Sequence, residues 1–286
     1  IHLTKHHRIF FFSNMNNSPI GIFDSGIGGL TVAHSIKEKM PNESIIYFGD
    51  TQHLPYGGKS KSAIIDFSSS ITKFLINNKC KAIVIACNSA SSVSYKTVKD
   101  IAGEIPVFNV IDPVVENLNN EDLKGKIGVV GTKTTISSDI YKKKITSINK
   151  DSDVVSLSTP LLAPMIEEGF INLDISKKII ENYLNNPILK NIKSLILACT
   201  HYPLIKYEIK QFYKNKINII NSVNIVAQHI SDELTRFNLL NNKTDPEYMF
   251  YVSNYTSSFE KSARFFFREK IKLEEINLHL YTKKNT

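Results

Sequence analysis

Two segments of this chain repeat one pattern of an apolar run, a cysteine and small polar residues. Lys81–Ser92 reads KAIVIACNSASS and Lys193–Leu204 reads KSLILACTHYPL, so Cys87 and Cys199 hold equivalent places at a spacing of 112 residues. Each apolar run is short and rich in β-branched residues, which is typical of a buried strand in a parallel sheet. The residues after each cysteine favour caps and turns, so we expect a helix to begin close to each thiol.

A second pair of matching segments extends this repeat. Ile20–Val32 reads IGIFDSGIGGLTV and Ile127–Tyr141 reads IGVVGTKTTISSDIY, with Gly131 and Thr132 in the places of Asp24 and Ser25. The similar spacing of the two pairs indicates an internal duplication. We therefore expect an α/β protein of two similar doubly wound, flavodoxin-like domains related by internal pseudo-symmetry. Ligands of such sheets bind beyond the carboxyl ends of the strands, so we expect the active site in the cleft between the domains.

The remaining pattern suggests where these domains begin and end. We expect a crossover near Asp112 and Pro113, a first domain of residues 16–112 plus 223–286, and a second domain of residues 113–222. The chain begins with Ile1, and Met15 stands just before the first expected strand. We therefore expect residues 1–15 to be a disordered or non-native extension. Phe250–Tyr255 (FYVSNY) is expected to be the last strand, followed by a helix over Ser257–Arg268.

Composition narrows the class of protein. The chain is 42% hydrophobic and 22% charged, which is typical of a globular protein, and we find no apolar run long enough for a membrane span. Its three cysteines have no close pairing, which indicates a reducing compartment, and we expect the cytoplasm. The net charge of +8 comes from scattered lysines without a basic cluster interleaved with aromatics, so a solvated surface is favoured over nucleic-acid binding.

The glycine-rich turn over Asp24–Val32 (DSGIGGLTV) is only partly similar to a dinucleotide-binding fingerprint. It lacks the third glycine at the required spacing, and the carboxylate at its mouth would repel a pyrophosphate. We therefore expect no nucleotide cofactor. Asp24 itself is open to two interpretations, as the N-cap of the following helix or as part of a functional site.

Two thiols facing one cleft predict acid–base chemistry on a single carbon. A thiol has an ordinary pKa near 8.5, which a helix N-terminus or a cation lowers toward neutrality, so one thiolate can remove a proton while the other thiol returns one to the opposite face. Asp24 and His201 are the candidates for assisting these transfers. No lysine context indicates pyridoxal phosphate, and Cys199-Thr-His201 offers only two metal ligands, so we expect neither cofactor nor metal. The candidate donors for a substrate carboxylate are Ser25, Asn88, Ser89, Thr132, Thr200 and free helix N–H groups.

At these residues the sequence resembles the glutamate racemases of the aspartate/glutamate racemase superfamily. The resemblance runs from Pro19 to about Phe267 and is carried by FDSGIGGLTV, YFGDTQHLPYGGKS, IVIACNSAS, PVFNVIDP, IGVVGTKTTISS, PLLAPMIEEG and LILACTHYPL. Two positions depart from the family pattern: Ser89 replaces a more usual threonine, and Asn221 replaces a usual acidic residue before Ser222. Neither departure removes a proton-transfer group.

The resemblance implies cofactor-independent interconversion of L- and D-glutamate, which supplies D-glutamate for peptidoglycan, and a homodimer. It implies that Cys87 and Cys199 are the acid–base pair, acting on the D- and the L-enantiomer respectively. It also implies supporting roles for Asp24, His201, Asp50 and Glu167. The substrate-contacting positions it implies are Asp24, Ser25, Tyr56, Gly57, Asn88, Ser89, Thr132, Thr200 and His201.

Three alternatives remain open at this stage. One is a racemase of aspartate or another amino acid, which the identity of the racemised substrate would reveal. Another is a thiol-based redox or binding protein, although no resolving cysteine adjoins either thiol, and Cys80 precedes a strand where we expect it to be inert. The third is a nucleic-acid-binding protein, which salt-dependent binding would expose.

Overall fold

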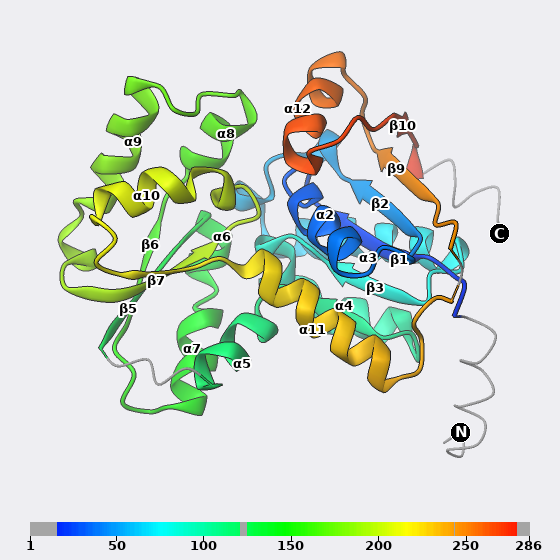
Figure 1. Cartoon of the computed structure of the whole chain (residues 1–286), viewed down its shortest axis with the longest axis horizontal. Coiled ribbons are helices and arrows are strands. Elements are labelled where there is room, and N and C mark those ends of the chain that lie inside the picture. The colour runs from blue at the N-terminus through cyan, green and yellow to red at the C-terminus, as the bar shows by residue number, and fades with distance from the viewer. Residues whose placement is uncertain (1–15, 121–124, 243, 279–286) are drawn as a thin grey trace.

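Two all-parallel β-sheets, each covered by helices, make up the molecule (Figure 1). The structure is a computed structural model and describes residues 16–120, 125–242 and 244–278. Residues 1–15, expected to be an extension, lie outside the described residues. The prediction of two α/β units with parallel sheets is confirmed. The domain boundaries expected at residues 112 and 222 stay predictions.

The six-stranded sheet has the order β10-β9-β2-β1-β3-β4. Its strands come from both ends of the chain: β1 Ile20–Asp24, β2 Ile45–Gly49, β3 Ala82–Ile85, β4 Val107–Asn109, β9 Tyr248–Val252 and β10 Leu273–Glu275. With helices α2 Leu30–Lys39, α3 Lys61–Asn77, α4 Asn88–Ala102, α11 Ser222–Arg236 and α12 Ser257–Phe267 it forms what we call the first lobe (Figure 1).

The four-stranded sheet has the order β6-β5-β7-β8. Its strands are β5 Lys126–Gly131, β6 Val154–Ser158, β7 Ile192–Ala198 and β8 Asn218–Ile220. Its helices, which with it form the second lobe, are α5 Asp112–Asn120, α6 Lys133–Ser137, α7 Ile140–Ile148, α8 Leu162–Glu167, α9 Asp174–Leu184 and α10 Lys206–Phe212. Short 3₁₀ turns occur at η1 Thr51–His53, η2 Tyr56–Gly58, η3 Pro187–Leu189 and η4 Tyr202–Ile205.

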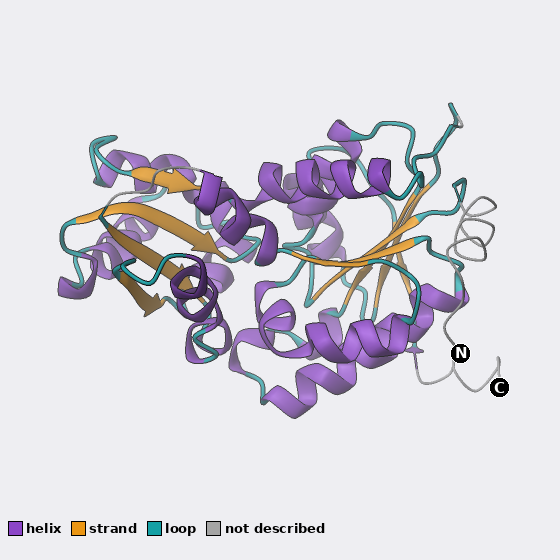
Figure 2. Ribbon diagram, turned by 90° about the horizontal axis from the view of Figure 1, so that it is seen from below, coloured by secondary structure: helices purple, strands orange, loops and turns teal. Residues whose placement is uncertain are grey.

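Alternation along the strands explains how helices cover both faces of a sheet. Successive side chains of a strand point to opposite faces. Ile20 and Ile22 of β1 belong to one core together with Leu30 of α2, whereas Phe23 belongs to a second core together with Ile64 of α3. Both sides of every central strand are therefore apolar, which explains the unbroken hydrophobic runs in the sequence. Figure 2 shows strands of the first lobe between layers of helices.

The strand orders determine where a ligand can bind. The orders β2-β1-β3-β4 and β6-β5-β7-β8 are the same arrangement repeated, because in each half the chain places its second strand on one side of the first and then crosses to the other side. Such a switch point, between β1 and β3 or between β5 and β7, leaves a crevice at the carboxyl ends of the strands. Asp24 and Cys87 lie at the first switch point, and Gly131 and Cys199 lie at the second.

Two local predictions differ from the structure. Phe250–Tyr255 does not hold the last strand, because β10 pairs in parallel with β9 further along the chain. The helix expected close to Cys199 begins further along the chain: a 3₁₀ turn that contains Pro203 comes first, and α10 begins at Lys206.

Candidate active site

A narrow cavity of about 30 Å³ lies where the carboxyl ends of the two sheets face each other. Cys87 and Cys199 both line it, one from each lobe, and they are 5% and 6% exposed. This volume holds no more than a few water molecules, so a ligand of amino-acid size requires the walls to move apart. The lining residues are Ser25, Leu54, Pro55, Tyr56, Gly57, Cys87, Asn88, Ser89, Thr132, Ala163, Pro164, Glu167, Cys199, Thr200 and His201.

The helix that the sequence predicts close to Cys87 is α4, and Cys87 is its N-cap. Its Sγ accepts a hydrogen bond from the backbone N–H of Ala90 at 3.5 Å. Burial, followed by the nearby negative charge of Asp24, raises the pKa of Cys87 to about 12, against smaller opposite effects of the Ala90 N–H and the Ser25 hydroxyl. Cys87 is therefore a protonated thiol in the unliganded protein and is suited to donate a proton.

Asp24 lies behind Cys87 and is completely buried, without lining the cavity itself. Its Oδ2 accepts hydrogen bonds from the backbone N–H groups of Gly26 at 3.1 Å and Gly29 at 3.0 Å. It thus closes the turn before α2 rather than capping that helix, whose N-cap is Gly29. Its Oδ1 has no hydrogen-bond partner among the described residues, and burial raises the pKa of the carboxyl group. That free oxygen is available to accept a proton or an ammonium group.

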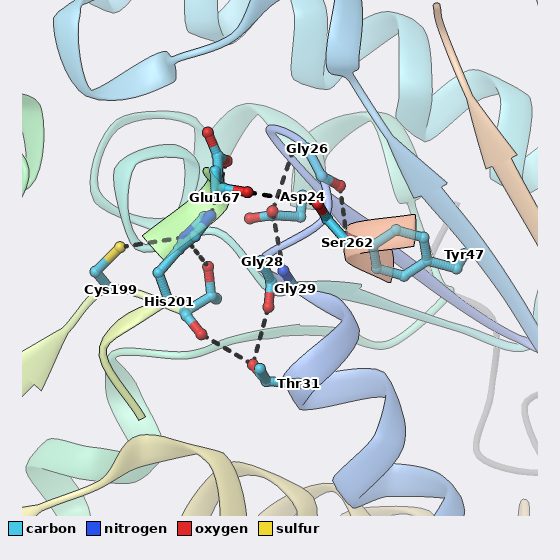
Figure 3. A network of polar contacts seen from close by, with 11 residues as sticks. Asp24, Gly26, Gly28, Gly29, Thr31, Tyr47, Glu167, Cys199, His201 and Ser262 are labelled. Carbon is cyan, nitrogen blue, oxygen red and sulfur yellow. Dashed lines mark hydrogen bonds and ion pairs between the residues drawn. The ribbon is translucent and has the colours of Figure 1, made fainter. Parts of the chain in front are cut away.

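A histidine and a glutamate stand beside the second thiol (Figure 3). His201 lies with Nδ1 3.6 Å from Cys199 Sγ and with Nε2 2.8 Å from Glu167 Oε1. Burial alone would lower the pKa of His201, but the hydrogen bonds with Cys199 and Glu167 outweigh it and raise that pKa well above the ordinary value. A protonated imidazole places a positive charge 3.6 Å from Cys199 Sγ, whereas Cys87 has the carboxylate of Asp24 nearby. The two thiols therefore have opposite surroundings.

The other predicted contact residues are brought together around the cavity. Ser25, Tyr56, Gly57, Asn88, Ser89, Thr132 and Thr200 all line it. Ser89 and Thr132 share a hydrogen bond of 2.8 Å between their hydroxyl groups, which joins the lobes at the cavity wall. A Cβ at Gly57 would come within 2.6 Å of the Thr132 Cβ, so only a glycine allows the loop to approach this closely.

Asp50, like Asp24, is a predicted site carboxylate that does not line the cavity. It is 2% exposed and binds Tyr56 Oη at 2.6 Å, Ser253 Oγ at 2.7 Å and His53 Nδ1 at 2.8 Å. Of these partners only Tyr56 lines the cavity. Asp50 can therefore reach a ligand only by orienting the tyrosine.

Sequence reasoning missed the apolar side chains that complete the cavity wall. Leu54, Pro55, Ala163 and Pro164 complete the cavity lining, but no polar signal marks them. Their neighbours Tyr56 and Glu167 were identified, so adjacency in the chain was the available clue. Among the described residues, the one group of three side chains close enough to share a metal ion is His34, Glu38 and Glu269, and none of them lines this cavity.

Fold and site together define a class: an α/β protein of two pseudo-symmetric parallel sheets with one thiol from each sheet in a shared cavity. The model of the Asp/Glu/Hydantoin racemase family matches residues 30–230. The chain belongs to this family, as the sequence motifs predict. No helix among the described residues has the length and apolar character needed to cross a bilayer.

Individual relatives agree with this assignment. A glutamate racemase of Neisseria meningitidis serogroup C is 37% identical over 262 residues, which cover 91% of this chain and 97% of that protein. A crystal structure of glutamate racemase from Francisella tularensis in complex with D-glutamate matches with a TM-score of 0.88 at 38% identity, covering 93% of this chain and all of that one. Glutamate racemase isoform RacE1 of Bacillus anthracis matches with a TM-score of 0.87 at 34% identity, covering 91% and 98%.

Proposed function

We propose that this protein is a glutamate racemase, which interconverts L- and D-glutamate by two-base proton transfer without a cofactor. The observation that carries the proposal is the placement of Cys87 and Cys199, from different sheets, in the wall of one small cavity. Relatives similar over nearly the whole chain are named glutamate racemases, and one of them is known in complex with D-glutamate.

The unequal surroundings of the thiols support a direction for the first step. Cys199 faces a cationic His201 and acts as the thiolate, whereas Cys87 keeps its proton. The Cys199 thiolate takes the α-proton of L-glutamate, and Cys87 gives its own proton to the opposite face of the same carbon. The product is D-glutamate, Cys199 is left as a thiol and Cys87 as a thiolate. The reverse sequence acts on D-glutamate and restores the starting state.

The groups around the two thiols stabilise the charges that the reaction involves. Glu167 holds His201 in place through the 2.8 Å contact, and the free Oδ1 of Asp24 offers an acceptor beside Cys87. As the α-proton leaves, negative charge grows on the substrate carboxylate, and donors already in position lower the energy of that state. Asn88, Ser89, Thr132 and Thr200 supply such donors, while Ser25, Tyr56 and Gly57 complete the substrate contacts and Asp50 orients Tyr56.

We propose the wider role on the same basis. A racemase of this kind supplies D-glutamate for peptidoglycan from the cytoplasmic pool of L-glutamate, where the free thiols Cys87 and Cys199 stay reduced. We also propose a homodimer as the working form and no requirement for nucleic acid, membrane or metal.

Exchange of the α-proton in heavy water tests the proposal. Purified protein without added cofactor should convert either enantiomer of glutamate into the other with deuterium at the α-carbon, and should leave aspartate unchanged. Cys87→Ala and Cys199→Ala should each abolish interconversion. Cys80→Ala is the matched control, because Cys80 is fully buried and does not line the cavity. Interconversion that persists in either of the first two variants contradicts the two-thiol mechanism, and racemisation of aspartate alone contradicts the substrate.

A further inference from the structure

The amide of Asn88 offers the cavity one free donor. Asn88 is the first residue of α4, is 3% exposed and lines the cavity. Its Oδ1 accepts a hydrogen bond of 2.7 Å from the hydroxyl of Tyr141, while its Nδ2 has no partner among the described residues. A buried N–H group without a partner costs free energy, so its presence at a cavity points to a ligand that accepts from it.

Tyr141 determines which end of that amide is free. It lies on α7, is 2% exposed, and burial raises the pKa of its hydroxyl above the ordinary value. The hydroxyl therefore stays protonated and donates its hydrogen to an acceptor. Asn88 provides the acceptor only when its oxygen faces Tyr141, and then its NH₂ group must face the other way.

This contact crosses between the lobes. Asn88 belongs to the first lobe and Tyr141 to the second, which also carries Cys199. The hydroxyl of Ser89, the next residue of α4, forms hydrogen bonds with two hydroxyl groups of the second lobe, those of Thr132 at 2.8 Å and Thr135 at 3.4 Å. The first turn of α4, directly after Cys87, is thus held by side chains of the opposite lobe. The donor of Asn88 takes its orientation only when the two lobes are in contact.

We propose that Tyr141 is a positioning residue: by fixing the Asn88 amide, it directs Nδ2 at a carboxylate of the substrate. Tyr141 does not line the cavity and touches no ligand itself. The inference rests on the proposed function, because it needs a substrate that carries a carboxylate.

A double-mutant cycle on racemisation tests this role. Tyr141→Phe leaves the ring in place and removes the hydroxyl, so the amide can turn. We expect kcat/KM to fall about tenfold, mostly through a higher KM, since the amide holds the carboxylate before and during proton transfer. Asn88→Ala should lower kcat/KM at least as far. In the Asn88→Ala background, Tyr141→Phe should have no further effect, because a positioning residue has nothing left to position.

Two additional variants separate positioning from stability. Asn88→Asp keeps an acceptor for Tyr141 but lacks the N–H, so it should lose substrate affinity even with the tyrosine intact. Tyr95→Phe is the matched control: Tyr95 is also on α4, and its hydroxyl donates to Val107 O at 3.4 Å, away from the cavity. It should keep the wild-type KM. Thermal unfolding of each variant shows whether loss of fold accounts for any change.

Each outcome is decisive. An unchanged KM in Tyr141→Phe, a wild-type KM in Asn88→Asp, or a further tenfold loss in the double variant would each overturn the positioning role. If the wild-type protein racemises no glutamate at all, the proposed function fails first, so the two failures are distinguishable.

Discussion

Replacing Gly28 by alanine should disable the Cys199 side of the site, although no reacting residue is replaced. A Cβ built at Gly28 stands 2.7 Å from Thr200 Oγ1 and closer still to the imidazole of His201, whereas ordinary contacts begin at 3.4 Å. Gly28 O also accepts from Thr31 at 2.9 Å, and Thr31 donates to Thr200 O at 3.0 Å, so the backbone here cannot easily withdraw (Figure 3).

The magnitude follows from how far the ring must move. Clearing the new methyl group requires a displacement of about 1 Å, and a misplacement of that size in a catalytic arrangement costs roughly 100-fold in rate. The 3.6 Å contact between His201 Nδ1 and Cys199 Sγ would be lost with it. We therefore expect kcat/KM of Gly28→Ala to fall by about two orders of magnitude.

The assay is racemisation followed by circular dichroism of the amino acid, alongside thermal unfolding. Gly58→Ala is the matched control, because nothing lies within 4 Å of its added Cβ, and it should stay within about twofold of wild type. Retention of more than half of the wild-type kcat/KM by a folded Gly28→Ala protein would refute the reasoning, since the packing of His201 against this turn would then not matter.

Two other predictions concern charged pairs. Glu167→Gln removes the negative partner that helps to raise the pKa of His201, so the imidazole should lose its proton at lower pH. The alkaline decline of the pH–rate profile should then begin at lower pH, and rates on that limb should fall about ten- to a hundredfold. An alkaline limb that does not move would contradict this role of Glu167. Lys81→Met leaves the carboxylate of Glu43 buried without the cation that lies 2.5 Å away, and should lower the free energy of unfolding by about 3–5 kcal/mol in urea titrations. Adding Glu43→Leu should recover part of this loss, because it removes the charge but also the acceptor of the Asn241 backbone N–H at 2.7 Å. No recovery at all would contradict the assignment of the cost to an unpaired buried charge.

The sequence alone was sufficient for the parts of this protein that depend on local pattern. The apolar runs before Cys87 and Cys199 predict strands, and the residues after Cys87 predict the start of α4. The repeat of these units predicts two similar sheets, because the same local signals in the same order build the same topology. The parallel pairing then places both thiols at carboxyl ends of strands.

Local pattern failed where a tertiary contact or a single residue intervened. A 3₁₀ turn lies between Cys199 and α10, so this thiol has a histidine beside it instead of a helix N-terminus. Asp50 belongs to a site motif, yet Tyr56 lies between it and the cavity.

What the tertiary structure alone decided is which distant side chains meet. The hydrogen bond between Tyr141 and Asn88 joins residues 53 positions apart, and that between Glu167 and His201 joins residues 34 apart. Nothing in either segment by itself marks the partner, because a side-chain contact depends on how the helices and sheets pack and not on the sequence on either side. Sequence pattern thus established the two strands and their thiols, whereas the packing of helices and sheets established the polarity of the site around them.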